Sequence, residues 1–379
     1  MAGFPFMRQA EAFRSSLPFI LLLAVFILPC PMSAAARPRP AMRRAGGTPR
    51  PAIAFVHLLL PPGGEPHASP TGWIGSLDRA RDTLESLRIP TIVSSASPGN
   101  AEDLNELSEM DPEVLITTSP LLYAAACDVA KRSPNTVFFA CTDETVHDNM
   151  SGFQARTYEA HYLAGLIAGA LSEDGVIGYL ANDPYQSKAS RLRNANAFTL
   201  GAQKSKAAIR VLYAPGNDPD EELKTLIAAG ADIVDLERAL PSLVERLREH
   251  SVRYVGTAGR TVDPLCLAAP EWEWSNAFGD LLTQVRFGIW RPRNVSYGIK
   301  EGVVGLSPFG PAVPETVRVR VREAKEAIRN GASPFEGPVR DVSGSLRIAE
   351  GSVPDDATLR GMDWRVQGLE PLPLTPDGL

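Results

Sequence analysis

The 379-residue sequence contains few of the residues that most often bind metal ions, with only four cysteines and five histidines. The histidines are His57, His67, His147, His161 and His250, and none stands one helical turn from another metal ligand. No two cysteines have the close spacing of a metal clamp. We therefore expect a protein that uses neither a metal ion nor a cofactor.

Motifs of the common enzyme classes are also missing. The sequence has no Gly-x-Ser-x-Gly elbow, no Gly-x-Gly-x-x-Gly fingerprint and no phosphate-cradling loop. Its adjacent carboxylates, such as Asp143-Glu144 and Asp355-Asp356, are interpreted as exposed charges in loops or at helix starts. We do not expect an enzyme, and a divergent α/β enzyme is kept as an alternative.

The sequence has no large excess of positive charge. It carries 38 lysines and arginines against 44 aspartates and glutamates, a formal net charge of −6, and the basic residues are scattered except near the start. Nucleic-acid binding needs lysines and arginines gathered on one face, so we expect no nucleic-acid partner. The length is too great for one compact core and, with 44% hydrophobic residues, suits two domains.

The longest apolar run, residues 17–32, is short and interrupted by prolines, whereas a spanning helix needs ~20 apolar residues. Arg8 and Arg14 precede the run, and small residues up to Ala36 follow it. This order is typical of a secretory signal peptide, so we predict a signal peptide over residues 1–36, cleavage near Ala36 and a periplasmic or otherwise exported protein. A permanent membrane anchor is the alternative.

Two features next to the cleavage site concern how the mature chain begins. Cys30 follows Pro29, which is a poor context for lipidation, so free release is favoured over a lipid anchor at Cys30. Residues 37–51 are rich in proline and arginine and are predicted to form a disordered linker.

Three cysteines remain after the predicted cleavage: Cys127, Cys141 and Cys266. Export would place them in an oxidising compartment, but an odd number leaves at least one thiol free. Buried thiols are the favoured interpretation. A bridge between Cys127 and Cys141 is the alternative, because a helix and the strand that follows it are neighbours.

Apolar strands and helices alternate along the mature chain, which predicts an α/β fold of two Rossmann-like lobes with parallel sheets covered on both faces. The predicted strands cover residues 52–60, 91–95, 114–118, 137–141, 176–181, 209–213, 233–235 and 254–257. Predicted helices include residues 72–88, 101–109, 120–131 and 276–288.

A further helix is predicted from the apolar residues that recur at helical spacing between Tyr158 and Leu171. Within it, Gly165 and Gly169 stand one turn apart, where the lack of a side chain would let another backbone pack closely. A short apolar strand follows, and then a second helix that ends in Asn194–Ala202. This order of helix, strand and helix indicates a parallel sheet.

Several motifs in this part of the chain resemble the basic membrane protein family of exported solute-binding proteins. They are Arg156-x-Tyr158-Glu159-Ala160, Tyr162-Leu163-Ala164-Gly165, Asn196-Ala197-Phe198 and, most specific, the block from Gly361 to Gly368. The resemblance implies a type I periplasmic binding protein that delivers nucleosides or purine bases to an ABC permease in the inner membrane.

The resemblance also implies how the chain is divided between the lobes. Residues 52–152 would form the N-terminal lobe, completed by about residues 270–300. Residues 153–269 would form the C-terminal lobe, completed by about residues 301–379. Ligands of parallel α/β sheets bind at the carboxyl ends of the strands, so we expect a cleft where the two lobes face each other.

Three tryptophans near the predicted cleft suit a flat ligand: Trp73, Trp272 and Trp274. Trp73 and Trp274 fall where the family's own tryptophans fall, although either could instead be a core residue. Ser119, which follows Thr118 in the family's Thr-Ser motif, could bind a ligand, cap the next helix, or do both. The remaining candidate contacts are Thr118, Tyr158 and Glu237.

The chain departs from the family at several positions of the predicted cleft. The acidic residue that relatives carry before the first tryptophan is missing from Ser69–Trp73, and Gly256–Arg260 has no aspartate. Glu237 stands near the place where relatives often carry a histidine, and it could supply the missing acceptor. We expect a receptor for a purine-like heterocycle with shifted specificity. A ligand sensor that does not take part in transport is the second alternative.

Overall fold

The structure is a computed structural model that describes residues 51–59, 72–142, 144, 147–183, 186–256 and 263–373. The predicted signal peptide, Cys30 and nearly all of the predicted linker lie outside these residues, and so do the cleft positions 69–71 and 257–260. Within the described ranges, no helix has both the length and the apolar character needed to cross a membrane.

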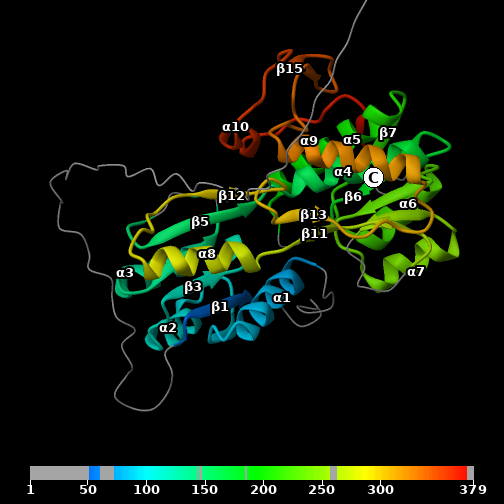
Figure 1. Ribbon diagram of the computed structural model, residues 1–379. Helices are drawn as coiled ribbons and strands as arrows, with labels where there is room; N and C mark the ends of the chain where they lie inside the picture. The colour runs from blue at the N-terminus through cyan, green and yellow to red at the C-terminus, as the bar shows by residue number, and fades with distance from the viewer. Residues whose placement is uncertain are drawn as a thin grey trace, which may run out of the picture. The chain divides into compact units, whose positions relative to one another are not determined.

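The first sheet has six parallel strands in the order β12-β5-β4-β3-β1-β2 (Figure 1). Its strands are β1 (Ile53–Leu58), β2 (Thr91–Ala96), β3 (Val114–Thr117), β4 (Val137–Cys141), β5 (Met150–Ala155) and β12 (Val295–Tyr297). The helices are α1 (Trp73–Ser86), α2 (Ala101–Glu109), the 3-10 helix η1 (Pro120–Leu122), α3 (Tyr123–Arg132) and α8 (Ser275–Arg286).

Alternate residues of these strands pack on opposite faces of the first sheet, as the two-residue repeat of a strand requires. Phe139 faces the core formed with α1 and α8, whereas Phe138 faces the core formed with α2 and α3. Both faces are therefore covered by helices, which explains why the strands are apolar throughout.

The second sheet also has six parallel strands, in the order β10-β9-β8-β6-β7-β16. Its strands are β6 (Val176–Leu180), β7 (Arg210–Ala214), β8 (Ile233–Leu236), β9 (Arg253–Gly256), β10 (Cys266–Ala268) and β16 (Leu369–Pro371). Helices α4 (Thr157–Leu171) and α5 (Lys188–Ser205) cover one face, and α6 (Pro219–Ala228) and α7 (Pro241–Glu249) cover the other. The predicted fold class of two parallel α/β lobes is confirmed.

Segments outside the two sheets connect the lobes and cover the second one. They are β11 (Pro270–Trp272), which pairs antiparallel with β13 (Val304–Leu306), the hairpin β14 (Val339–Arg340) and β15 (Leu346–Ile348), and the helices α9 (Glu315–Arg329) and α10 (Asp356–Arg360). Helix α9 packs its buried face against α4. Helix α9 and strands β5 and β12 were not predicted from the sequence, and the predicted helix over 120–131 is divided between η1 and α3.

Helices α4 and α5 pack with their backbones in close contact, as the glycine spacing predicted. A Cβ atom added to Gly165 would lie 2.0 Å from the carbonyl oxygen of Phe198, and one added to Gly201 would lie 2.1 Å from that of Tyr162. Real Cβ atoms are never that close to a backbone oxygen. The pairing of these two helices therefore depends on glycine at both positions.

No disulfide bond joins the cysteines that the structure describes, Cys127, Cys141 and Cys266. Cys127 lies in the core between the first sheet and helices α2 and α3, whereas Cys141 lies on the opposite face of the same sheet. The sheet itself separates the two sulfur atoms. The alternative of a bridge between these two cysteines is therefore wrong, and both are buried thiols.

Candidate functional site

A cavity of ≈ 100 Å³ lies where residues of the first sheet meet the start of helix α5. Residues that line it come from both lobes: Trp73, Pro120, Cys141, Gln154, Ala155, Thr157, Gln186, Ser187, Ser190, Arg193, Asn194 and Trp272. Larger hollows of ≈ 320 Å³, beside β11 and β13, and ≈ 870 Å³, beside β14 and β15, lie elsewhere. The smaller cavity combines residues at the carboxyl ends of β3, β4 and β6, where parallel sheets bind ligands, so we treat it as the candidate site.

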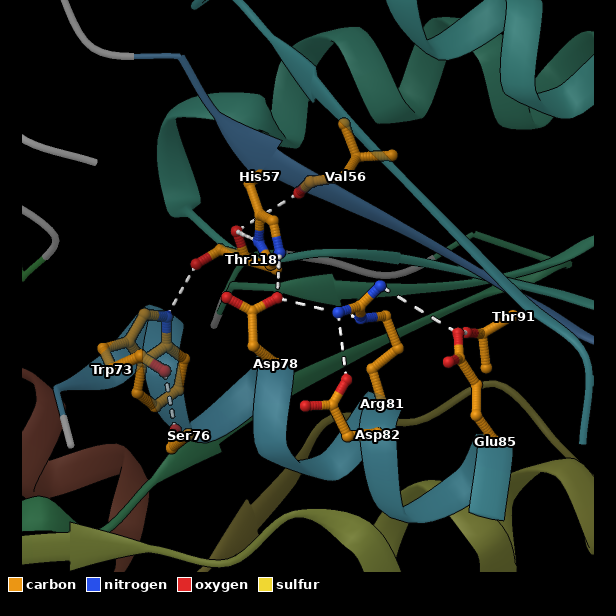
Figure 2. Close-up of polar contacts among 10 residues, drawn as sticks. All are labelled: Val56, His57, Trp73, Ser76, Asp78, Arg81, Asp82, Glu85, Thr91 and Thr118. Atoms are coloured by element: carbon orange, nitrogen blue, oxygen red, sulfur yellow. Dashed lines mark hydrogen bonds and ion pairs between the residues drawn. The ribbon is translucent and has the colours of Figure 1, made fainter. Parts of the chain in front are cut away.

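Trp73, the first residue of α1, is held in the cavity wall by its indole nitrogen. Its Nε1 donates a hydrogen bond to the carbonyl oxygen of Thr118 over 2.8 Å, as Figure 2 shows. Its ring is stacked against Phe153 at 6.4 Å between centroids. Because the only polar atom of the side chain is already bonded, Trp73 offers the cavity an apolar ring surface.

Thr118 and Ser119 lie behind this tryptophan and have no solvent exposure. The Thr118 hydroxyl contacts the carbonyl oxygen of Val56 and the ring of His57, which in turn reaches Asp78 (Figure 2). The Ser119 hydroxyl accepts from the backbone of Leu121 and caps η1. The structure thus gives both residues a positioning role, and ligand contact by either remains a prediction.

Trp272 and Trp274 lie in different environments although they are two residues apart. Trp272 lines the cavity, is 5% exposed and donates from Nε1 to the Thr157 hydroxyl over 3.2 Å. Trp274 is 0% exposed and stacks on Phe278 at 5.5 Å between ring centroids. The Trp274 ring is therefore packed in the core of the first lobe, and its contact with a ligand remains a prediction.

Tyr158 is buried in the first turn of α4 and does not belong to the cavity wall. Its ring packs against Phe335 at 5.4 Å and lies under the guanidinium of Arg193 at 5.7 Å. Burial raises the pKa of its hydroxyl. Direct contact between Tyr158 and a ligand remains a prediction, whereas its contact with Arg193, which lines the cavity, is part of the structure.

Glu237 follows β8 and belongs to a buried polar cluster with Tyr179, His161, Asp235 and Asn194. Its Oε1 accepts from the Tyr179 hydroxyl over 2.8 Å and from Asn194 Nδ2 over 3.4 Å. His161 Nδ1 lies 3.3 Å from an oxygen of Asp235. Glu237 therefore stands one side chain behind the cavity wall, with Asn194 between them, and its direct contact with a ligand remains a prediction.

Burial and charge shift the pKa values of this cluster in one direction. Burial raises the pKa of Glu237 from 4.5 to about 7, against the opposing effects of His161 and of the Tyr179 hydrogen bond. Burial lowers the pKa of His161, but the neighbouring carboxylates, Asp235 above all, outweigh it and the pKa is raised. The folded protein therefore binds more protons here than the unfolded chain does between pH 4.5 and 7.

We expect this proton uptake to make the stability fall as the pH rises from about 4.5 to about 7. Glutamine has the same shape as glutamate and stays neutral at every pH. The Glu237→Gln variant should therefore lose little of its free energy of unfolding as the pH rises. The free energy of unfolding at pH 8 should rise by about 1–3 kcal/mol, because each unit of pKa shift corresponds to ~1.4 kcal/mol.

Urea denaturation of the wild-type and Glu237→Gln proteins at pH 5 and pH 8 measures this effect. Glu245→Gln, which changes an exposed glutamate of α7, is the control and should leave the pH dependence unchanged. Equal pH dependence in the Glu237→Gln and wild-type proteins would contradict the prediction.

The first two turns of α5 are the part of the wall that the sequence analysis missed. None of the candidate contacts named from the sequence lies on α5, but the wall includes Gln186, Ser187, Ser190, Arg193 and Asn194. A signal was present, because Ser187 is the N-cap of α5 and its hydroxyl accepts from the Ser190 backbone. In a parallel sheet the helix that follows a strand begins at the ligand-binding edge.

Two α/β lobes of parallel strands, with an aromatic cavity lined from both, are the architecture of the type I periplasmic fold. A solved solute-binding protein of an ABC transporter from Conexibacter woesei has this fold, with a TM-score of 0.58 and 17% identity over 74% of this chain and 97% of that one. Residues 77–228 match the family model described as Bmp, ABC transporter substrate-binding protein PnrA-like. Over this range the chain is similar to the basic membrane protein family of ABC transporter substrate-binding proteins.

Two curated relatives cover most of the chain. A purine-binding protein of Brucella abortus is 28% identical over 316 residues, which are 79% of this chain and 89% of that protein. A putative ABC transporter glucose-binding protein of Haloferax volcanii is 28% identical over 307 residues, which are 75% of this chain and 78% of that protein. Both names describe solute-binding proteins, but the solute is a purine in the first name and glucose in the second.

Proposed function

We propose that the protein binds a purine base or nucleoside-like heterocycle in the cavity between its lobes and delivers it to an ABC permease in the inner membrane. The composition of the cavity wall carries this proposal. Trp73 and Trp272 supply ring surfaces, because their indole N–H groups are bonded to Thr118 and Thr157. A flat ring packs well against such surfaces, while polar groups on α5 contact its edge. The name of the Brucella relative supports the same ligand class.

In this proposal, delivery depends on hinge closure between the two lobes predicted from the sequence. The first lobe is residues 52–152 with about 270–300, and the second is residues 153–269 with about 301–379. The cavity volume of ≈ 100 Å³ is below the ~300–1,000 Å³ of typical ligand sites, so opening is needed to admit a ligand. A ligand that contacts both lobes stabilises the closed state, which a permease then recognises.

Calorimetry with the purified protein tests the ligand class. We expect binding of at least one of adenine, guanine, xanthine, uric acid and adenosine, and much weaker binding of glucose and of amino acids. Mass spectrometry of any small molecule that co-purifies with the protein provides an independent identification. Tight binding of glucose or of an amino acid, with no binding of any purine, would rule the proposal out.

Variants of two tryptophans place the binding site. Trp73→Ala should weaken purine binding about tenfold to a hundredfold, a loss of about 1.4–2.7 kcal/mol, because stacking and apolar contact are lost together. Trp290→Ala is the matched control, since Trp290 is also partly buried and is not among the residues that line the cavity. Equal losses in the two variants would show that the cavity is not the binding site.

A further inference from the structure

We propose that the α5 wall of the cavity selects a ring rich in carbonyl acceptors, as in an oxopurine, over an amino-substituted ring such as adenine. This inference rests on the proposed function and narrows its ligand class. The observation behind it is a set of donors and acceptors among the described cavity residues: Ser190, Thr157 and Arg193 as donors, Asn194 as an acceptor, and the Gln154 amide, which can be either.

Ser190 and Thr157 each present a hydroxyl hydrogen for donation. The Ser190 hydroxyl oxygen accepts from the Ser187 hydroxyl over 3.1 Å and from Arg193 over 3.3 Å. The Thr157 hydroxyl oxygen accepts from Trp272 Nε1 over 3.2 Å. Each hydroxyl has one hydrogen, and the oxygens of Ser190 and Thr157 already accept hydrogen bonds. A ligand therefore satisfies the hydrogen bonding of each hydroxyl best by offering an acceptor.

Arg193 brings a permanent positive charge to the same wall. It is 7% exposed, and its guanidinium is positioned by the carbonyl oxygen of Leu359, the Ser190 hydroxyl and the Tyr158 ring. The first turn of α5 contains no acidic residue, so the positive end of the helix adds to this charge. A carbonyl oxygen of a ligand is attracted to the Arg193 guanidinium, whereas the hydrogens of an amino group are repelled by it; the carboxyl groups of Asp183 and Glu237 lie behind Gln186 and Asn194.

Asn194 presents an acceptor, and its orientation is determined by its neighbours. Gln186 donates from Nε2 to a carboxylate oxygen of Asp183 over 3.0 Å, so its Oε1 accepts from Asn194 Nδ2 over 2.8 Å. The same Nδ2 also donates to Glu237 over 3.4 Å. Both hydrogens of Nδ2 are thus directed into the protein, and Oδ1 accepts no hydrogen bond from the described residues. A ring N–H of the ligand can donate to this oxygen.

The wall positions are one turn apart on a single helix. Ser190, Arg193 and Asn194 are related by three and four residues, so their side chains lie on the same face of α5. Among these three residues of α5, Ser190 and Arg193 are donors and Asn194 is the acceptor. A ring with carbonyl oxygens beside an N–H satisfies this arrangement, whereas adenine has no carbonyl oxygen and carries two extra hydrogens on its amino group.

Calorimetry with xanthine and adenine, which share the same ring system, tests the inference. Wild-type protein should bind xanthine at least tenfold more tightly than adenine. Ser190→Ala and Arg193→Lys should each reduce this ratio several-fold. Arg191→Lys is the matched control, because Arg191 is also on α5 but bonds to the carbonyl oxygens of Ala181 and Pro215 and is not among the lining residues.

The possible outcomes separate this inference from the proposed function. Adenine binding as tight as xanthine binding would overturn the inference and leave the purine receptor in place. Absence of binding to every purine would overturn both. If Arg193→Lys fails to fold because its contact with Leu359 is lost, Ser190→Ala still decides, and an unchanged ratio in that variant would refute the role of the α5 wall.

Discussion

Replacing Trp274 with alanine should lower the free energy of unfolding by about 3–5 kcal/mol, the usual loss when a buried tryptophan is truncated. The ring has no exposed surface and contacts Trp73, Phe153 and Tyr297 edge-on at 5.2–5.8 Å between centroids, in addition to its stack on Phe278. Removal leaves a cavity that the surrounding rings cannot fill. Urea denaturation monitored by circular dichroism measures the loss.

The ligand affinity of the molecules that remain folded separates packing from binding. Trp274 does not line the cavity, so this affinity should change by less than the tenfold expected for Trp73→Ala. Trp290→Ala, at a partly buried position, should cost less stability than Trp274→Ala. A stable Trp274→Ala protein with strongly reduced affinity would instead support the ligand contact that the sequence suggested for this residue.

A second large effect is expected for Gly165→Ala in helix α4. The new Cβ would lie 2.0 Å from the backbone oxygen of Phe198, so α4 and α5 would have to move apart along their whole contact. Overpacking of a well-packed core typically costs 1–3 kcal/mol, and we expect a loss at or above about 3 kcal/mol because the opposing atoms are backbone.

The control for this substitution is Gly279→Ala in helix α8. An added Cβ at Gly279 meets no atom within 4 Å, and alanine favours a helix over glycine by about 1 kcal/mol. Thermal melting should therefore show a lower transition temperature for Gly165→Ala and an unchanged or higher one for Gly279→Ala. A Gly165→Ala protein as stable as the wild type would show that the two helices are not in backbone contact.

The elements best predicted from the sequence are those whose signal is local. Helix α2 and strand β4 have the predicted bounds, because each is a short periodic or continuously apolar segment between turn residues. The close packing at Gly165 was also predictable, because glycines one turn apart in an apolar helix indicate close contact with another backbone. Strand β12 carries no such signal: its three residues are only half buried and are defined by pairing with the distant β5.

The candidate site was harder to predict because the direction of each side chain depends on the backbone conformation of single residues. Trp272 and Trp274 would share a side of a continuous strand. The strand ends between them, however, and Trp274 has helical dihedral angles of φ −95° and ψ −13° at the start of α8. That local turn directs one ring into the core while the other stays in the cavity wall. A pattern of residue types contains no information about such a turn.

The order of strands in the two sheets has a consequence for the biosynthesis of the protein. The first sheet gains its edge strand only when Val295–Tyr297 pairs with β5, which ends at Ala155, and the second gains its edge strand only at Leu369–Pro371. In a growing chain the longer strand β5 is therefore the edge of the first sheet throughout the synthesis of most of the second lobe, until β12 covers it. Unpaired edges promote aggregation, so the incomplete chain is expected to be more prone to aggregation than the finished protein, in which the short strand β12 covers β5.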